Sequence, residues 1–157
     1  MTNFVKLALA ATAMTVAAPA LADDIVVQTK PQMDQWSARV SNELDSALEK
    51  AEWHNGASKP GIVQLRFTVD QNGKAEDISV MRSSGNDRTD DNAITAVSLL
   101  DSLGDAPVSS VANRTFQANI VFARNDLQKL NFVKELRQSE RDRMARGDAE
   151  EVILIGG

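Results

Sequence analysis

Residues 61–73 read Gly-Ile-Val-Gln-Leu-Arg-Phe-Thr-Val-Asp-Gln-Asn-Gly, and this stretch decides the fold. Its apolar residues alternate with polar ones from Val63 to Val69, which predicts a strand with one buried face and one wet face. The sequence of residues 70–73 predicts a tight turn, because Asn and Gly tolerate the positive φ of hairpin turns. Residues 74–82 return as a second strand, with Ile78 and Val80 as its apolar positions. We therefore predict a β-hairpin.

Two amphipathic helices flank this hairpin. Residues 31–52 predict a helix, because apolar residues recur three or four apart before the stop signal Asn55-Gly56. The face that we expect to be buried comprises Met33, Trp36, Val40, Leu44, Leu48 and Ala51. Residues 87–103 predict a second helix, with Asp87 or Thr89 as its N-cap and Gly104 after its end. Its expected core face comprises Ala93, Val97, Leu100 and Leu103.

The remaining chain predicts a third strand, a third helix and an apolar tail. Residues 114–123 alternate, with Phe116, Ala118, Ile120 and Phe122 expected inward and Thr115, Gln117, Asn119 and Val121 outward. Asn125 precedes a helix that is expected to use Leu127, Leu130, Val133 and Leu136 on one side. We expect the part of this helix beyond Arg137 to project into solvent or to fray, since few apolar residues follow. The tail, residues 152–155, is β-prone.

The order of these elements is α-β-β-α-β with an extra helix. A right-handed crossover places the third strand beside the first, so the strand order is 2-1-3. A three-stranded antiparallel sheet with helices on one face buries both amphipathic stripes. We predict an α+β fold, a two-layer sandwich.

The N-terminal 22 residues have the layout of a secretory signal peptide. Lys6 precedes an apolar run, and Ala20-Leu21-Ala22 is a small-x-small cleavage sequence. The apolar run is shorter than the ~20 residues that a membrane-spanning helix needs. We expect cleavage after Ala22, a periplasmic location, a core domain over residues 23–123, and a C-terminal helix and tail over residues 124–157.

Composition excludes several classes of function. The 157 residues include no Cys and one His, which argues against disulfide frameworks, Cys-ligated metals, thiol catalysis and multi-histidine metal sites. A net charge of −5 argues against duplex nucleic acid as a partner, because phosphate binding needs a positive field.

The chemistry-bearing residues have structural interpretations. Ser84 lacks a nucleophile elbow, and Ser-Gly between a strand and a helix is typical of a turn. His54 stands at a helix end, where a cation complements the dipole. Asp90 and Asp91 suit a helix N-terminus. We expect no catalytic site, no metal and no cofactor.

Residues 61–122 resemble the C-terminal domain of the TonB family. The residues that carry the resemblance are the strand and turn at 61–73, Val80-Met81-Arg82-Ser83-Ser84-Gly85, and the helix start at 90–97. Gly61, Gly73, Ser84, Gly85 and Asp90 are the family-motif positions, with expected structural roles. Thr89 and Asn92 stand where the family has Leu and a small Ala, and its Tyr-Pro before the first strand is absent. Because we expect the N-terminus to be cleaved, and only Pro31 lies between Asp23 and the first helix, we also expect the chain to lack the family's membrane anchor and Pro-rich spacer. It therefore resembles a stand-alone periplasmic relative.

The third strand is the candidate binding element. An open edge accepts an extended peptide by strand addition. The resemblance implies a segment of an outer-membrane transporter as this guest, flanked by Thr115, Gln117, Asn119 and Val121. The alternative is that the tail covers the edge, in its own chain or in a homodimer. The first interpretation predicts a non-enzymatic TonB-like protein that binds an envelope protein, with a link to energy-coupled transport. The second predicts a structural or oligomerising envelope protein that uses its C-terminal helix and tail.

Overall fold

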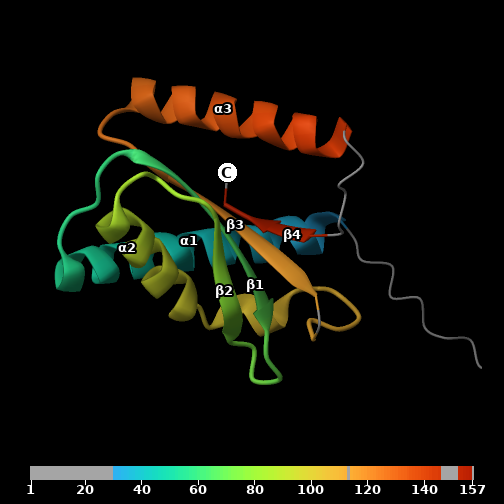
Figure 1. Cartoon of the computed structure of the whole chain (residues 1–157). Coiled ribbons are helices and arrows are strands. Elements are labelled where there is room, and N and C mark those ends of the chain that lie inside the picture. Colours follow the sequence, from blue (N-terminus) through green and yellow to red (C-terminus); the bar gives the residue numbers. More distant parts are fainter. Residues whose placement is uncertain (1–29, 113, 146–151, 157) are drawn as a thin grey trace, which may run out of the picture.

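The computed structural model describes residues 30–112, 114–145 and 152–156 (Figure 1). The expected signal peptide, residues 1–22, lies outside the described residues. Within the described part, no helix is both long and apolar enough to cross a membrane.

A four-stranded sheet organises the chain, in the order β2-β1-β3-β4. Its strands are β1 (Gly61–Val69), β2 (Ala75–Arg82), β3 (Thr115–Phe122) and β4 (Val152–Ile155). β1 pairs antiparallel with both β2 and β3, and β4 pairs parallel with β3. The α+β class, the hairpin and the order 2-1-3 are confirmed. The expected sheet of three strands is wrong by one strand, because the apolar tail adds β4.

Helices α1 (Lys30–Asn55) and α2 (Asp87–Ser98) cover one face of the sheet (Figure 1). They bury an apolar core in which the Phe67 and Phe116 rings stack at 5.6 Å and Trp36 packs tilted on Phe116 at 6.3 Å. The Trp36 indole nitrogen donates to the Ser102 carbonyl oxygen at 2.9 Å. The predicted core faces of both helices are confirmed. Met33 and Leu48 lie at the margin of the core, partly buried.

The end and the cap of α2 differ from the prediction. Helix α2 stops at Ser98, and Leu103 belongs to a separate 3-10 turn, η1 (Ser102–Asp105). Leu100 and Leu103 are nevertheless fully buried, so the apolar spacing correctly predicted their burial even though they lie beyond the end of the helix. The N-cap is Asn86, whose side-chain oxygen accepts from the backbone nitrogen of Thr89. Asn is among the best N-cap residues, and here it precedes both candidates that the sequence suggested.

Strand β2 is irregular. Its register with β1 shifts twice, and Asp77 has a φ of +52° at one of the shifts, so β2 bulges. Val80, one of the two apolar positions of the predicted strand, is 41% exposed. Bulges on an outer strand hinder pairing with a further chain.

Helix α3 (Asp126–Ala145) covers the opposite face of the sheet (Figure 1). The structure therefore has a third layer, and the expectation of helices on one face only is wrong for α3. Leu136 is buried as predicted, but Leu127 and Leu130 are exposed. The half beyond Arg137 was expected in solvent, yet Glu140 there contacts the sheet.

Candidate protein-interaction edge

The outer edge of β3 is divided into a covered part and a free part. β4 pairs with residues Thr115–Ala118, and Ile155 enters the main core fully buried. Gly156 then lies against the Asn119 carbonyl oxygen, where an added Cβ would approach to 2.6 Å. Gly156 also has a φ of +79°, so only glycine suits this position. Beyond it, no described strand pairs with β3 on this side. Coverage of the edge by the tail, the alternative left open by the sequence, is thus observed within the same chain.

A groove of 210 Å³ lies beside the free part of the edge. Asn119, Ile120 and Val121 of β3 line it together with Gly156. Helix α1 contributes Ser41, Leu44, Asp45 and Leu48, and helix α3 contributes Lys129 and Val133. The groove therefore has apolar walls, one acidic and one basic side chain, and strand backbone along one side. These are the features that an extended peptide needs for pairing and for seating a side chain.

The four predicted partner-binding residues fall into two groups. Thr115 and Gln117 lie where β4 already pairs with β3. Asn119 and Val121 line the groove. Gln117 and Asn119 were expected outward and wet, but both are buried. Helix α3 covers the face to which their side chains point, which the spacing of β3 alone does not reveal.

A polar cluster joins this face of the sheet to α3. Gln64 and Asn119 are cross-strand partners, and the Gln64 amide nitrogen donates to Asn119 Oδ1 at 2.9 Å. The Gln117 amide nitrogen donates to Asn119 Oδ1 at 3.1 Å and to Glu140 Oε1 at 2.8 Å. Arg143 Nε donates to Glu140 Oε2 at 2.8 Å. Glu140 thus links two strands to a cation of its own helix.

Burial is the largest influence on Glu140 and opposes its ionisation. Hydrogen bonds from Arg143, Gln117 and Gln64, with the charge of Arg143, outweigh it and hold the pKa of Glu140 below its ordinary value. Sequence analysis missed Glu140 and Arg143. Their i, i+3 spacing is also common on solvated helices, so no sequence signal marked them.

The family-motif residues have structural roles. A Cβ on Gly61 would lie 2.7 Å from the Ser84 Cβ, so β1 and the loop after β2 approach closely. Gly73, with a φ of +78°, closes the hairpin turn, and Gly85, with a φ of +83°, lies in the loop before α2. Asp90 accepts from the Ser84 backbone nitrogen at 2.9 Å and from its hydroxyl at 2.7 Å. Burial opposes ionisation of Asp90, but hydrogen bonds from Ser83 and Ser84 lower its pKa.

The two residues at the start of α2 that depart from the family pattern form hydrogen bonds with the loop before β1. Thr89 and Asn92 are fully buried. The Thr89 hydroxyl accepts from the Lys59 backbone nitrogen at 2.8 Å, and the Asn92 amide donates to the Gly56 carbonyl oxygen at 2.9 Å. These polar side chains therefore hold the segment that leads into β1.

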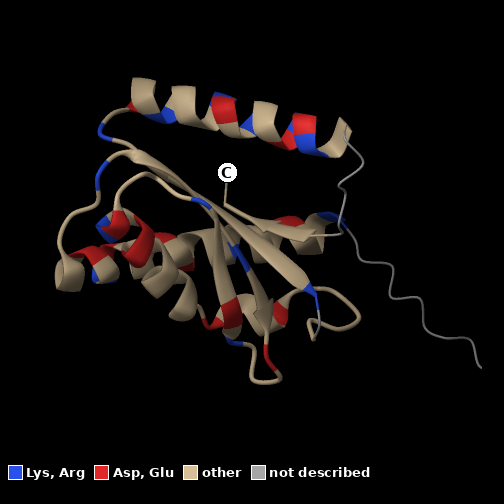
Figure 2. Cartoon of the chain, in the orientation of Figure 1, with Lys and Arg blue, Asp and Glu red and all other residues tan. Residues whose placement is uncertain are grey.

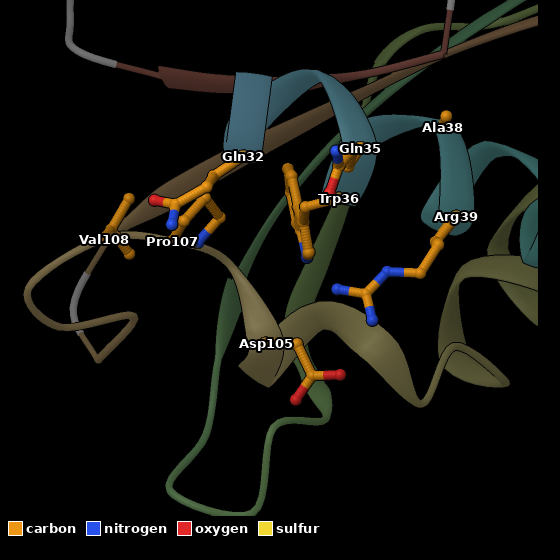
Figure 3. A pocket seen from close by; sticks show the side chains of 8 residues that line it. All are labelled: Gln32, Gln35, Trp36, Ala38, Arg39, Asp105, Pro107 and Val108. Carbon is orange, nitrogen blue, oxygen red and sulfur yellow. The ribbon is translucent and has the colours of Figure 1, made fainter. Parts of the chain in front are cut away.

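A second hollow, of 730 Å³, lies between the first half of α1 and the chain after η1 (Figure 3). Gln32, Trp36 and Arg39 face Asp105 and Pro107 across it. None of its lining residues belongs to the β3 edge. Among the described residues, no group of three or more His, Asp or Glu could hold a metal ion.

Comparison with known protein families finds a match for the segment that contains this edge. Residues 57–123 match the family model of the Gram-negative bacterial TonB protein C-terminal domain. This segment is a TonB C-terminal-like domain. The matched residues contain β1, β2, α2 and β3, whereas α1, α3 and β4 lie outside them. No curated protein and no solved structure matches the chain. TonB C-terminal domains are non-enzymatic protein-interaction domains of the Gram-negative envelope that contact outer-membrane transporters.

Proposed function

We propose that this protein is a periplasmic TonB-like adaptor that binds an extended segment of an envelope protein by strand addition at the free end of the β3 edge. An outer-membrane transporter is the partner to which the family points. The observation that carries the proposal is the division of the edge: β4 pairs with Thr115–Ala118, and the groove begins at Asn119. Export by the predicted signal peptide is part of the proposal.

Three properties of the groove favour a peptide guest. The backbone of residues 120–122 has no described strand partner on the outer side, so it offers hydrogen-bonding groups to an incoming strand. Leu44 and Leu48 offer an apolar wall. Asp45 and Lys129 stand on different helices, so they fix the orientation of a charged guest.

The other edge of the sheet is less suited to strand addition. β2 carries two register irregularities and a residue with positive φ. An incoming strand would have to follow this bulged backbone, which disrupts regular pairing. We therefore expect strand addition at the β3 edge and not at the β2 edge, so the β2 edge serves as the control.

The test places a photo-reactive residue at Val121, beside the groove, and a matched one at Met81, exposed on β2. Both variants are irradiated in intact envelopes, and the crosslinked peptides are identified by mass spectrometry. We expect Val121 to yield an adduct to an extended segment of one envelope protein, and Met81 to yield none to that protein. Adducts from both positions alike, or from Val121 only to the protein itself, would contradict strand addition.

Deletion of residues 152–157 sharpens the test. Without β4, residues Thr115–Ala118 are free as well, so the guest strand can pair along the whole of β3. We expect a photo-reactive residue at Thr115 to crosslink the partner only in this shortened protein. The structural alternative, assembly through the tail, predicts instead that the deletion lowers the molar mass measured by light scattering.

A further inference from the structure

The outer face of α3 presents a line of exposed apolar and basic side chains. We call this line the α3 outer stripe; its residues are Leu127, Leu130, Lys134, Arg137, Arg141 and Met144. Leu127, Leu130 and Met144 are 71%, 66% and 59% exposed, and they lie on one line of the helix rather than scattered singly over the surface. The three cations lie between these apolar ends and are exposed as well.

The stripe is one continuous surface. Its residues follow one another at alternating intervals of three and four, which on a helix of 3.6 residues per turn places them in one sector. The other side of the helix is fixed to the sheet by buried Leu136 and by the contacts of Glu140. Among the described residues, no other element lies over the outer side of α3 (Figure 1). The sheet therefore holds the stripe outward in a fixed direction.

Three of the four acidic residues of α3 are engaged elsewhere, and the fourth, Asp126, is the first residue of the helix, eight positions before Lys134. Glu140 is tied to Arg143, Glu135 forms an ion pair with Arg82 of β2, and Asp142 accepts from the Gln138 amide at 2.8 Å. At 100° per residue, Glu135 and Asp142 fall on the flank of the helix away from the basic stripe. The cations of the stripe thus face solvent with little neutralisation from their own helix.

The charge of this region is opposite to that of the rest of the protein. Residues 124–146 contain seven basic and four acidic residues, a net +3, whereas the whole chain carries −5, which leaves −8 for the remainder. Acidic residues gather over α1 and α2, across the sheet from α3 (Figure 2). Such a separation of charge orients a protein with its basic side toward an anionic surface.

We propose that the α3 outer stripe binds the surface of a bilayer containing anionic phospholipid. A single convex helix offers no groove for a protein segment, whereas lipid headgroups conform to it. Lys and Arg side chains are attracted to the negative surface potential of an anionic bilayer, and exposed leucines enter the boundary between headgroups and acyl chains. The stripe combines both kinds of side chain on one line. This inference does not depend on strand addition, because the groove and the stripe use different surfaces.

The test is co-sedimentation of the full chain with phosphatidylcholine vesicles that contain or lack phosphatidylglycerol. We expect binding only to the anionic vesicles, weakening as salt is added. Replacement of Lys134, Arg137 and Arg141 by Glu should lower the affinity on the order of tenfold or more. A matched control replaces Lys30, Arg39 and Lys50, exposed on α1, by Glu and changes the net charge equally. We expect this control to retain binding.

Circular dichroism of each variant separates loss of binding from loss of fold. A second variant, Leu127→Ser with Leu130→Ser, should weaken binding without a change in net charge. The proposal is overturned if the protein binds neither kind of vesicle. It is also overturned if both triple variants lose vesicle binding equally. A further contradicting outcome is that the stripe variants still bind vesicles but no longer bind an acidic protein.

Discussion

The face of the sheet beneath α1 and α2 and the face beneath α3 are covered by side chains of opposite character. The first buries rings and aliphatic chains, with Trp36, Phe67 and Phe116 at its centre. The second buries Leu136 beside amides and a carboxylate that are joined by hydrogen bonds. Apolar burial is additive and tolerant of geometry, whereas a buried polar cluster stabilises only while every member keeps its partners. The two faces should therefore fail in different ways.

The largest effect is expected from truncation on the apolar face. Phe116→Ala removes a fully buried ring that stacks on Phe67, and we expect a loss of about 3–5 kcal/mol in the free energy of unfolding. Urea unfolding followed by circular dichroism measures it. Phe132→Ala on α3, where the side chain is half-buried, is the matched control and should cost less than half as much. Equal losses from the two changes would mean that the faces contribute alike.

The apolar face of the sheet could be predicted from the sequence, whereas the polar face could not. Alternation in β1 and β3 and the three-to-four spacing in α1 predicted the apolar face almost residue by residue, because burial by apolar contact leaves a periodic pattern. The same reasoning placed Leu127 and Leu130 on one side of α3 with Leu136, but Leu136 is buried and both of the others are exposed. A polar contact leaves no periodic mark in one sequence.

The candidate site was predictable to a similar extent. The hairpin and the alternating third strand predicted β3 as the candidate binding edge, and the apolar residues 152–155 indicated a strand able to cover it. The register of β4 decides which half of the edge is free, and in this register Gly156 lies against the Asn119 carbonyl oxygen. That contact joins residues far apart in the chain. Spacing within single elements could not reveal it.

Removal of a hydrogen-bond acceptor from the polar face should lower stability by an intermediate amount. Glu140→Ala removes one of the two acceptors of the Gln117 amide and one acceptor of the Arg143 guanidinium at a partly buried site, and such a loss costs about 1–3 kcal/mol. We expect faster amide hydrogen exchange across residues 126–145, with little change in α1. Glu135→Ala, which breaks only the half-exposed pair with Arg82, is the control and should leave exchange in α3 nearly unchanged. Faster exchange in α1 and α3 together would show that α3 does not detach on its own.

Acidification should loosen the same face more mildly. Because the pKa of Glu140 is lowered in the folded protein, its ionised form stabilises the fold at pH values above the ordinary glutamate pKa. That stabilisation is lost as the pH falls through the lowered pKa. We expect amide exchange in α3, corrected for the intrinsic pH dependence, to accelerate over this range in the native protein. In Glu140→Gln it should stay level, and an equal acid response in both would assign the effect to another group, such as Asp90.

The smallest effect is expected outside both faces, on the α3 outer stripe. Leu127→Ser and Leu130→Ser alter side chains that are mostly exposed, so each should change the free energy of unfolding by no more than about 0.5 kcal/mol. Leu136→Ser makes the same change nine positions after Leu127 and six after Leu130, but on the buried side of α3. It should cost several times more, because it places a hydroxyl where an apolar side chain is buried. Urea unfolding of the three variants compares them directly. Losses of similar size would show that the exposed leucines pack within the monomer, which would remove them from any membrane contact.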